Sequence, residues 1–158
     1  MSIKITGGRK LRSYLNKNSK IKSNILNVGF LSPDMAQIAM KNEYGGYHDV
    51  SSEYADRALA KGIKLGESIK IIPRPFMQQT VNVFKNEWGK QLSNIMHDTP
   101  NVIESLDGLG QIIKTQIQYT IQDGDFEENP SFVQEIKDND TPLIDSGKML
   151  DSVDYEIL

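Results

Sequence analysis

Two long apolar stripes in the second half of the chain constrain its fold more than any other feature. From Met77 to Ile95, apolar side chains recur at intervals of four, three, four, four and three residues, which is the spacing of one helix face. A second stripe runs from Val102 to Ile117, and Gly124 ends the pattern. We therefore expect two long helices, each with one apolar face.

The connection between the two stripes is short. With Thr99 as an N-cap and Pro100 at the first helical position, the second helix begins almost where the first ends, so the two must be antiparallel neighbours. Gly108 and Gly110 weaken the second helix by roughly 1 kcal/mol each relative to Ala. We expect another part of the chain to pack closely against them.

The remaining elements are shorter. Pro33 follows the capping residue Ser32 and begins a helix that Gly45 ends. Asp145 or Ser146 is expected to cap a single turn near Met149. Apolar runs and alternation predict short strands at 3–5, 25–30, 68–72 and 153–157, and helical spacing predicts a short helix at 11–15. The expected fold is α+β: one domain, 1–158, with a small, mainly antiparallel sheet packed against the two long helices and the short helices. A projecting loop or insertion, in which 53–61 could form a short helix, is expected around 47–68, and an acidic loop around 123–141.

Composition excludes several kinds of chemistry. The chain has no cysteine and only two histidines, which removes disulfides, thiolate zinc sites and cysteine nucleophiles. His48 and Asp49 are adjacent, so in an extended segment their side chains point to opposite faces. No phosphate-binding glycine loop is present. We expect no catalytic residue, cofactor or metal. We also expect no membrane span, because no apolar run approaches ~20 residues, and we expect folding in a cytoplasm.

Charge is distributed unevenly along the chain. Residues 1–22 carry seven cations and no acid, whereas residues 123–158 carry eleven acids and two lysines. Both segments can simply be solvated surfaces. Alternatively, opposite ends of neighbouring subunits attract one another in a head-to-tail ring. A third hypothesis is a binding module that contacts nucleic acid through the basic segment.

Three segments have an unusual composition: 42–45 (Asn-Glu-Tyr-Gly), 72–77 (Ile-Pro-Arg-Pro-Phe-Met) and 142–153, which begins Pro-Leu-Ile-Asp-Ser-Gly. In the second segment the prolines extend the chain and deliver Phe76 to the start of a long helix. In their order, these segments resemble the phage virion morphogenesis family, which includes Mu-like tail completion and neck proteins. The chain departs from the family pattern in having one residue fewer between the prolines, Ser146 in place of Thr, and 26 residues between the first two segments.

The resemblance covers residues 25–158 and implies a structural virion protein without catalytic activity. Such a protein forms a ring, commonly a hexamer, at the neck or tail end of a tailed bacteriophage, as tail terminator, tail completion or head-tail joining protein. The implied partners are further copies, connector and tail proteins, and DNA passing through the ring. The candidate interaction residues are Lys4, Arg9, Lys10, Arg12, Tyr47, His48, Tyr54, Arg57, Arg74, Asp138, Asp140 and Asp145.

Overall fold

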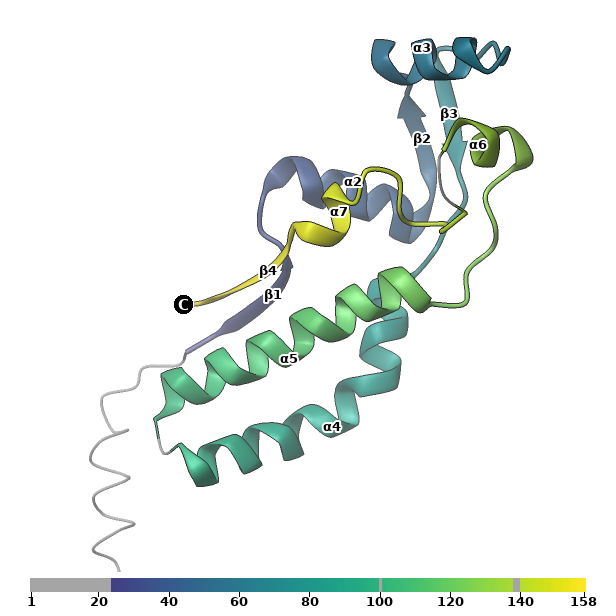
Figure 1. Cartoon of the computed structure of the whole chain (residues 1–158). Helices are drawn as coiled ribbons and strands as arrows, with labels where there is room; N and C mark the ends of the chain where they lie inside the picture. The colour runs from purple at the N-terminus through teal and green to yellow at the C-terminus, as the bar shows by residue number, and fades with distance from the viewer. Residues whose placement is uncertain (1–23, 100, 138–139) are drawn as a thin grey trace, which may run out of the picture.

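The computed structural model describes residues 24–99, 101–137 and 140–158, and it has the predicted α+β class (Figure 1). The predicted strand at 3–5 and helix at 11–15 lie outside the described residues. The elements, in chain order, are β1 (Leu26–Phe30), α2 (Pro33–Tyr44), β2 (Gly46–Asp49), α3 (Ser52–Ala60), β3 (Ser68–Ile71), α4 (Phe76–Asp98), α5 (Val102–Asp123), α6 (Ser131–Ile136), α7 (Lys148–Asp151) and β4 (Val153–Ile157).

The two long helices α4 and α5 form the predicted antiparallel hairpin (Figure 1). The cap of α5 differs from the prediction: the Asn101 side chain accepts the Ile103 N–H at 3.1 Å, and Thr99 instead ends α4. The apolar stripe of α4 is also less buried than expected. Trp88 stays partly exposed and donates its indole N–H to Gln116 on α5 at 2.7 Å. Among the described residues α4 packs chiefly against α5, so much of its stripe is a two-helix seam rather than a closed core.

The strands β1 and β4 form an antiparallel ladder that packs on α5. Its apolar side faces the helices, where Phe30 meets the completely buried Phe76 in a T-shaped contact with ring centroids 5.9 Å apart. The expected close packing at the α5 glycines is confirmed. A Cβ on Gly110 would lie 2.4 Å from the Tyr155 ring, and a Cβ on Gly108 would lie 3.4 Å from Ile95.

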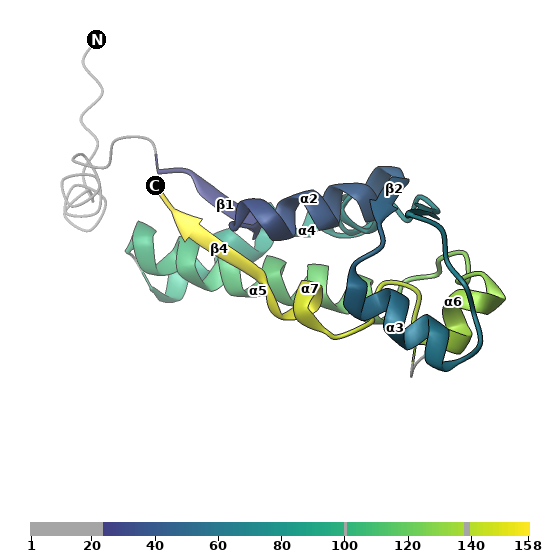
Figure 2. The same ribbon diagram turned by 90° about the horizontal axis from the view of Figure 1, so that it is seen from above.

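The stretch 47–68, expected as a projecting loop or insertion, is mostly regular structure. β2 and β3 pair as a second antiparallel ladder, and α3 connects them. Ser51 caps α3 by accepting the Tyr54 N–H at 3.2 Å. This unit, which we call the arm, extends to one side of the helical hairpin with α3 at its tip (Figures 1 and 2). The single sheet expected from the sequence is therefore two separate two-stranded ladders among the described residues.

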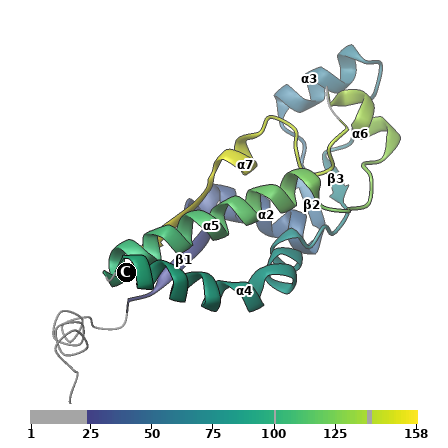
Figure 3. The same cartoon turned by 60° about the horizontal axis from the view of Figure 1, so that its bottom comes forward.

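Two further expectations need correction in the C-terminal part of the chain. The acidic stretch after α5 contains the helix α6, which lies beside the arm (Figure 3). The turn at α7 is not capped by Asp145 or Ser146; its N-cap is Gly147 in the left-handed conformation, φ 77°. By contrast, Ser32 caps α2 as predicted, accepting the Met35 N–H at 3.3 Å. Within the described residues, no helix is both long and apolar enough to cross a membrane.

Candidate functional site

The first two unusual sequence segments meet at the start of α4. The N-cap of this helix is Pro75, which has no side-chain acceptor for the first N–H groups. Glu43, the buried second-last residue of α2, fills that role: its carboxylate accepts the N–H of Met77 at 2.8 Å and of Gln78 at 3.0 Å. A carboxylate at a helix N-terminus also interacts favourably with the helix dipole. Glu43 therefore fixes the direction in which α4 leaves the arm.

Arg74 extends this network toward the third segment. Its side chain is buried, with Nε donating to the Glu127 carbonyl at 2.8 Å and an Nη donating to Asn129 Oδ1 at 3.1 Å. Its backbone N–H donates to the Asn42 carbonyl at 2.7 Å. Burial lowers the pKa of Arg74, and the Glu127 carboxylate opposes that shift. A buried guanidinium with oriented acceptors is a structural anchor for the chain that follows α5.

The third segment closes the network. Asn129 donates to the Pro142 carbonyl at 3.4 Å, and Asn42 lies 3.9 Å from the sulfur of the buried Met149. Segments 42–45, 72–77 and 142–153 are thus connected through hydrogen bonds, either directly or through one intervening side chain. We call this set of contacts the junction.

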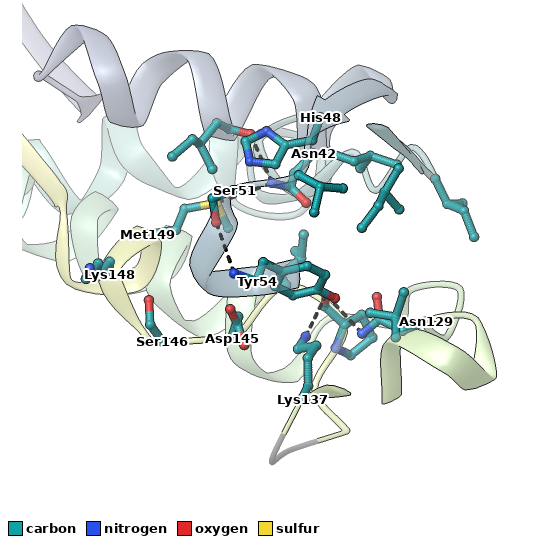
Figure 4. Close-up of a pocket in the computed structure, with 18 of the residues that line it drawn as sticks. Asn42, His48, Ser51, Tyr54, Asn129, Lys137, Asp145, Ser146, Lys148 and Met149 are labelled. Carbon is teal, nitrogen blue, oxygen red and sulfur yellow. Dashed lines mark hydrogen bonds between the residues drawn. The ribbon is translucent and has the colours of Figure 1, made fainter. Parts of the chain in front are cut away.

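A cavity of about 390 Å³ lies between the arm and the third segment (Figure 4). On its α3 side, Arg57 forms an ion pair with Asp145 at 3.1 Å and donates to the Ile136 carbonyl at 3.3 Å. The Arg57 guanidinium also lies over the Tyr54 ring, 5.7 Å from its centroid. Burial and the nearby Asp145 raise the pKa of Tyr54, and Arg57 opposes them. These contacts fasten the tip of the arm to α6 and the third segment.

Lys137 also lines the cavity and is itself buried. Its ammonium group donates to the carbonyl oxygens of Thr141 at 2.8 Å and Pro142 at 3.5 Å. Burial lowers its pKa to about 8, because a charged amine is less stable away from water. Lys137 therefore holds together the turn that leads into the third segment.

The structure brings together five of the predicted interaction residues and separates the others. Those that line the cavity are His48, Tyr54, Arg57, Arg74 and Asp145. Tyr47 is exposed on β2 and Asp140 is exposed before the third segment, and neither lines the cavity. The remaining predicted residues, Lys4, Arg9, Lys10, Arg12 and Asp138, lie outside the described residues.

Sequence reasoning did not identify Glu43, Asn129 or Lys137 as site residues. Glu43 belongs to a segment that the sequence did single out, and its role follows only when α2 and the start of α4 are adjacent. Asn129 and Lys137 lie in a stretch that was expected to be a solvated loop, and no signal in that stretch distinguishes them.

Catalytic chemistry has no evident centre at the junction. Arg74 donates to a backbone carbonyl and to the Asn129 amide oxygen, and Arg57 and Asp145 form an ion pair with each other. His48 is exposed at the rim of the cavity. Within the part of the chain that the structure describes, no group of three or more His, Asp or Glu side chains could hold a metal ion. The arrangement is suited to holding two parts of the molecule in a fixed relation.

Comparison of the chain with family models, with curated proteins and with solved structures finds no match.

Proposed function

We propose that the chain is a non-enzymatic structural protein of a tailed bacteriophage virion, acting as a ring subunit at the neck or tail end. The observation that carries the proposal is the junction. The three segments that resemble the virion morphogenesis family are 26 or more residues apart in the sequence, yet they form one network around Glu43 and Arg74. Segments that depend on one another in this way act as a single structural signature, which supports the resemblance more strongly than three separate short matches.

The shape of the molecule also supports an assembly role. Both ladders have only two strands, so each has strand edges without a neighbouring strand among the described residues. Isolated two-stranded ladders are marginally stable, and open edges favour association with other chains. In a ring, the arm is the element suited to contact an adjacent ring or the tail tube, with α3 at its tip. The exposed Tyr47 and Leu59 lie on the arm and are available for such a contact.

Electron microscopy of the purified protein tests the proposal. We expect closed rings of one symmetry, either alone or after addition of the connector and tail proteins encoded beside its gene. Pull-down with the same proteins should recover the chain. A tight homodimer that binds none of them would refute the proposal.

A further inference from the structure

An open groove follows the outer edge of β3. It has a volume of about 880 Å³ and lies between β3 and the chain that leads into α6. Apolar side chains line it, including Ile63, Leu65 and Phe132, together with Lys64, Lys70 and one acid, Glu127. A groove between a strand edge and a helix is the usual setting for binding an extended segment by strand addition.

The backbone of β3 has free groups along this groove. Val50 donates to the Glu67 carbonyl at 2.9 Å, so residues 50 and 67 form a bonded pair of the ladder. Bonded and non-bonded pairs alternate in an antiparallel ladder, which makes Ser68 and Lys70 the residues whose N–H and C=O point away from β2. Both residues are exposed. Neither backbone has a partner on that side within the described part of the chain.

The strand β4 has a complementary free edge. Ile25 and Leu158 exchange hydrogen bonds of 3.0 and 2.9 Å, so the same alternation directs the N–H and C=O of Tyr155 and Ile157 away from β1. The Tyr155 N–H itself already donates to the Asp154 carboxylate, which Lys114 also contacts at 3.1 Å. Of the four strands that the structure describes, only β4 has acidic side chains at alternate positions, Asp154 and Glu156.

We infer that the β3 edge of one subunit binds β4 of a second copy as a parallel neighbouring strand, with Lys70 opposite the partner's Glu156. In this register Ile157 of β4 donates to the carbonyl of Lys70, and Lys70 donates to the carbonyl of Tyr155. The Tyr155 N–H faces the carbonyl of Ser68 and must exchange its bond with the Asp154 carboxylate to reach it. The Val153 carbonyl is not included among these intersubunit hydrogen bonds, because that residue is completely buried.

The side chains select the parallel direction. Residues opposite each other lie on the same face of a sheet, so the parallel register places Lys70 beside Glu156 on one face. On the other face, Ile69 and Ile71 of β3 meet Tyr155 and Ile157 of β4. An antiparallel register that uses the same free backbone groups places Glu156 beside the isoleucines instead. The parallel register therefore pairs the charges and keeps one face apolar.

This contact deepens the proposed function. β3 lies on the arm, whereas β4 lies along α5, away from the tip of the arm (Figures 1 and 3). The contact joins two different surfaces, so it is heterologous and repeats head to tail. Such a contact gives a ring if the rotation closes and a filament if it does not. The strand pairing stands on the geometry above, and only its closure into a ring rests on the proposed function.

Disulfide crosslinking tests the register directly, because the chain has no cysteine of its own. Lys70→Cys and Glu156→Cys variants are prepared separately, mixed and oxidised mildly, and the products are separated on a non-reducing gel. We expect a species of twice the chain mass from the mixture. The matched control is Asn27→Cys in place of Glu156→Cys. Asn27 is paired with Glu156 on the adjacent strand β1, one strand farther from the free edge, where the distance to position 70 is too long for a disulfide.

The outcomes separate the contact from the function. A Lys70→Cys and Glu156→Cys disulfide without closed rings supports the strand pairing and refutes the ring. Closed rings without that disulfide refute the strand pairing and leave the proposed function standing. A disulfide between Lys70→Cys and Ser68→Cys, in place of the expected one, indicates β3 pairing with β3 in a two-fold dimer and overturns the inference. Absence of any self-association overturns it as well.

Discussion

Replacement of Glu43 tests whether the junction holds the arm and the helical hairpin together. The carboxylate accepts two backbone N–H groups at 2.8 and 3.0 Å, and the side chain is 6% exposed. Hydrogen bonds to charged groups contribute about 1.5 kcal/mol each at the lower end of the measured range. In Glu43→Ala both N–H groups lose their acceptor, so we expect the free energy of unfolding to fall by about 3 kcal/mol.

A second substitution separates charge from contact. Glu43→Gln keeps one oxygen acceptor and loses the charge and the second acceptor, so we expect a loss of about 1.5 kcal/mol, half that of the alanine variant. Urea denaturation gives both values. For a chain of this length, the alanine variant should unfold about 6–12 °C lower in a thermal scan. Glu87→Ala, at an exposed position in the middle of α4, is the matched control and should change stability by less than about 0.5 kcal/mol.

Two results would contradict this reasoning. A loss below about 1 kcal/mol in Glu43→Ala would mean that water or another group satisfies the start of α4 equally well. Equal losses in the glutamine and alanine variants would mean that the one oxygen contact that glutamine keeps contributes nothing.

Three further predictions concern other parts of the fold. Gly110→Ala places a Cβ against the tyrosine ring that packs there and should destabilise the protein by about 1–3 kcal/mol. Gly89→Ala, where a Cβ meets open space, should stabilise it by about 0.5–1 kcal/mol. Equal urea midpoints for the two variants would contradict this prediction. Burial lowers the Lys137 pKa to about 8 from 10.5, so the unfolded chain binds more protons than the folded one between these pH values. As the pH rises through that window, the free energy of unfolding of the wild type should therefore increase relative to that of Lys137→Met. A difference between the two proteins that stays constant with pH would refute this. Asp145→Asn weakens a half-exposed ion pair with Arg57, so we expect the free energy of unfolding to fall by less than about 1 kcal/mol. Amide hydrogen exchange should become faster in α3, and unchanged exchange in α5 is the control.

The sequence predicted the long elements well because their signals are local. The stripes of α4 and α5, the Ser32 cap and the strand near Val153 all depend on spacing within a single element, and the structure confirms them. Glycines inside a helix also predicted close packing, and Tyr155 packs on Gly110.

The first strand of the arm and its pairing with β3 were not predicted, because they depend on contacts between distant residues. β2 is exposed throughout and so shows no alternation, whereas β3 alternates in burial and lies within the strand predicted at 68–72. The junction was missed for the same reason. Asn42, Glu43 and Arg74 were in segments of evident interest, but their partners follow only from the tertiary fold.

The close approach of Gly45 and Pro73 has a consequence for which substitutions of whole segments the fold can tolerate. A Cβ at Gly45 would lie 2.9 Å from the Pro73 ring, so the point where the arm leaves the body adjoins the point where it returns. The arm is therefore a closed excursion of the chain, and the body needs only its two ends to be near each other. Loop-closure entropy depends weakly on length, so replacing the arm by a turn of a few residues changes its free-energy cost by only about 2 kcal/mol. Arms of different length and surface can thus be exchanged on one body, provided that α6 and Asp145 adapt to the loss of Arg57.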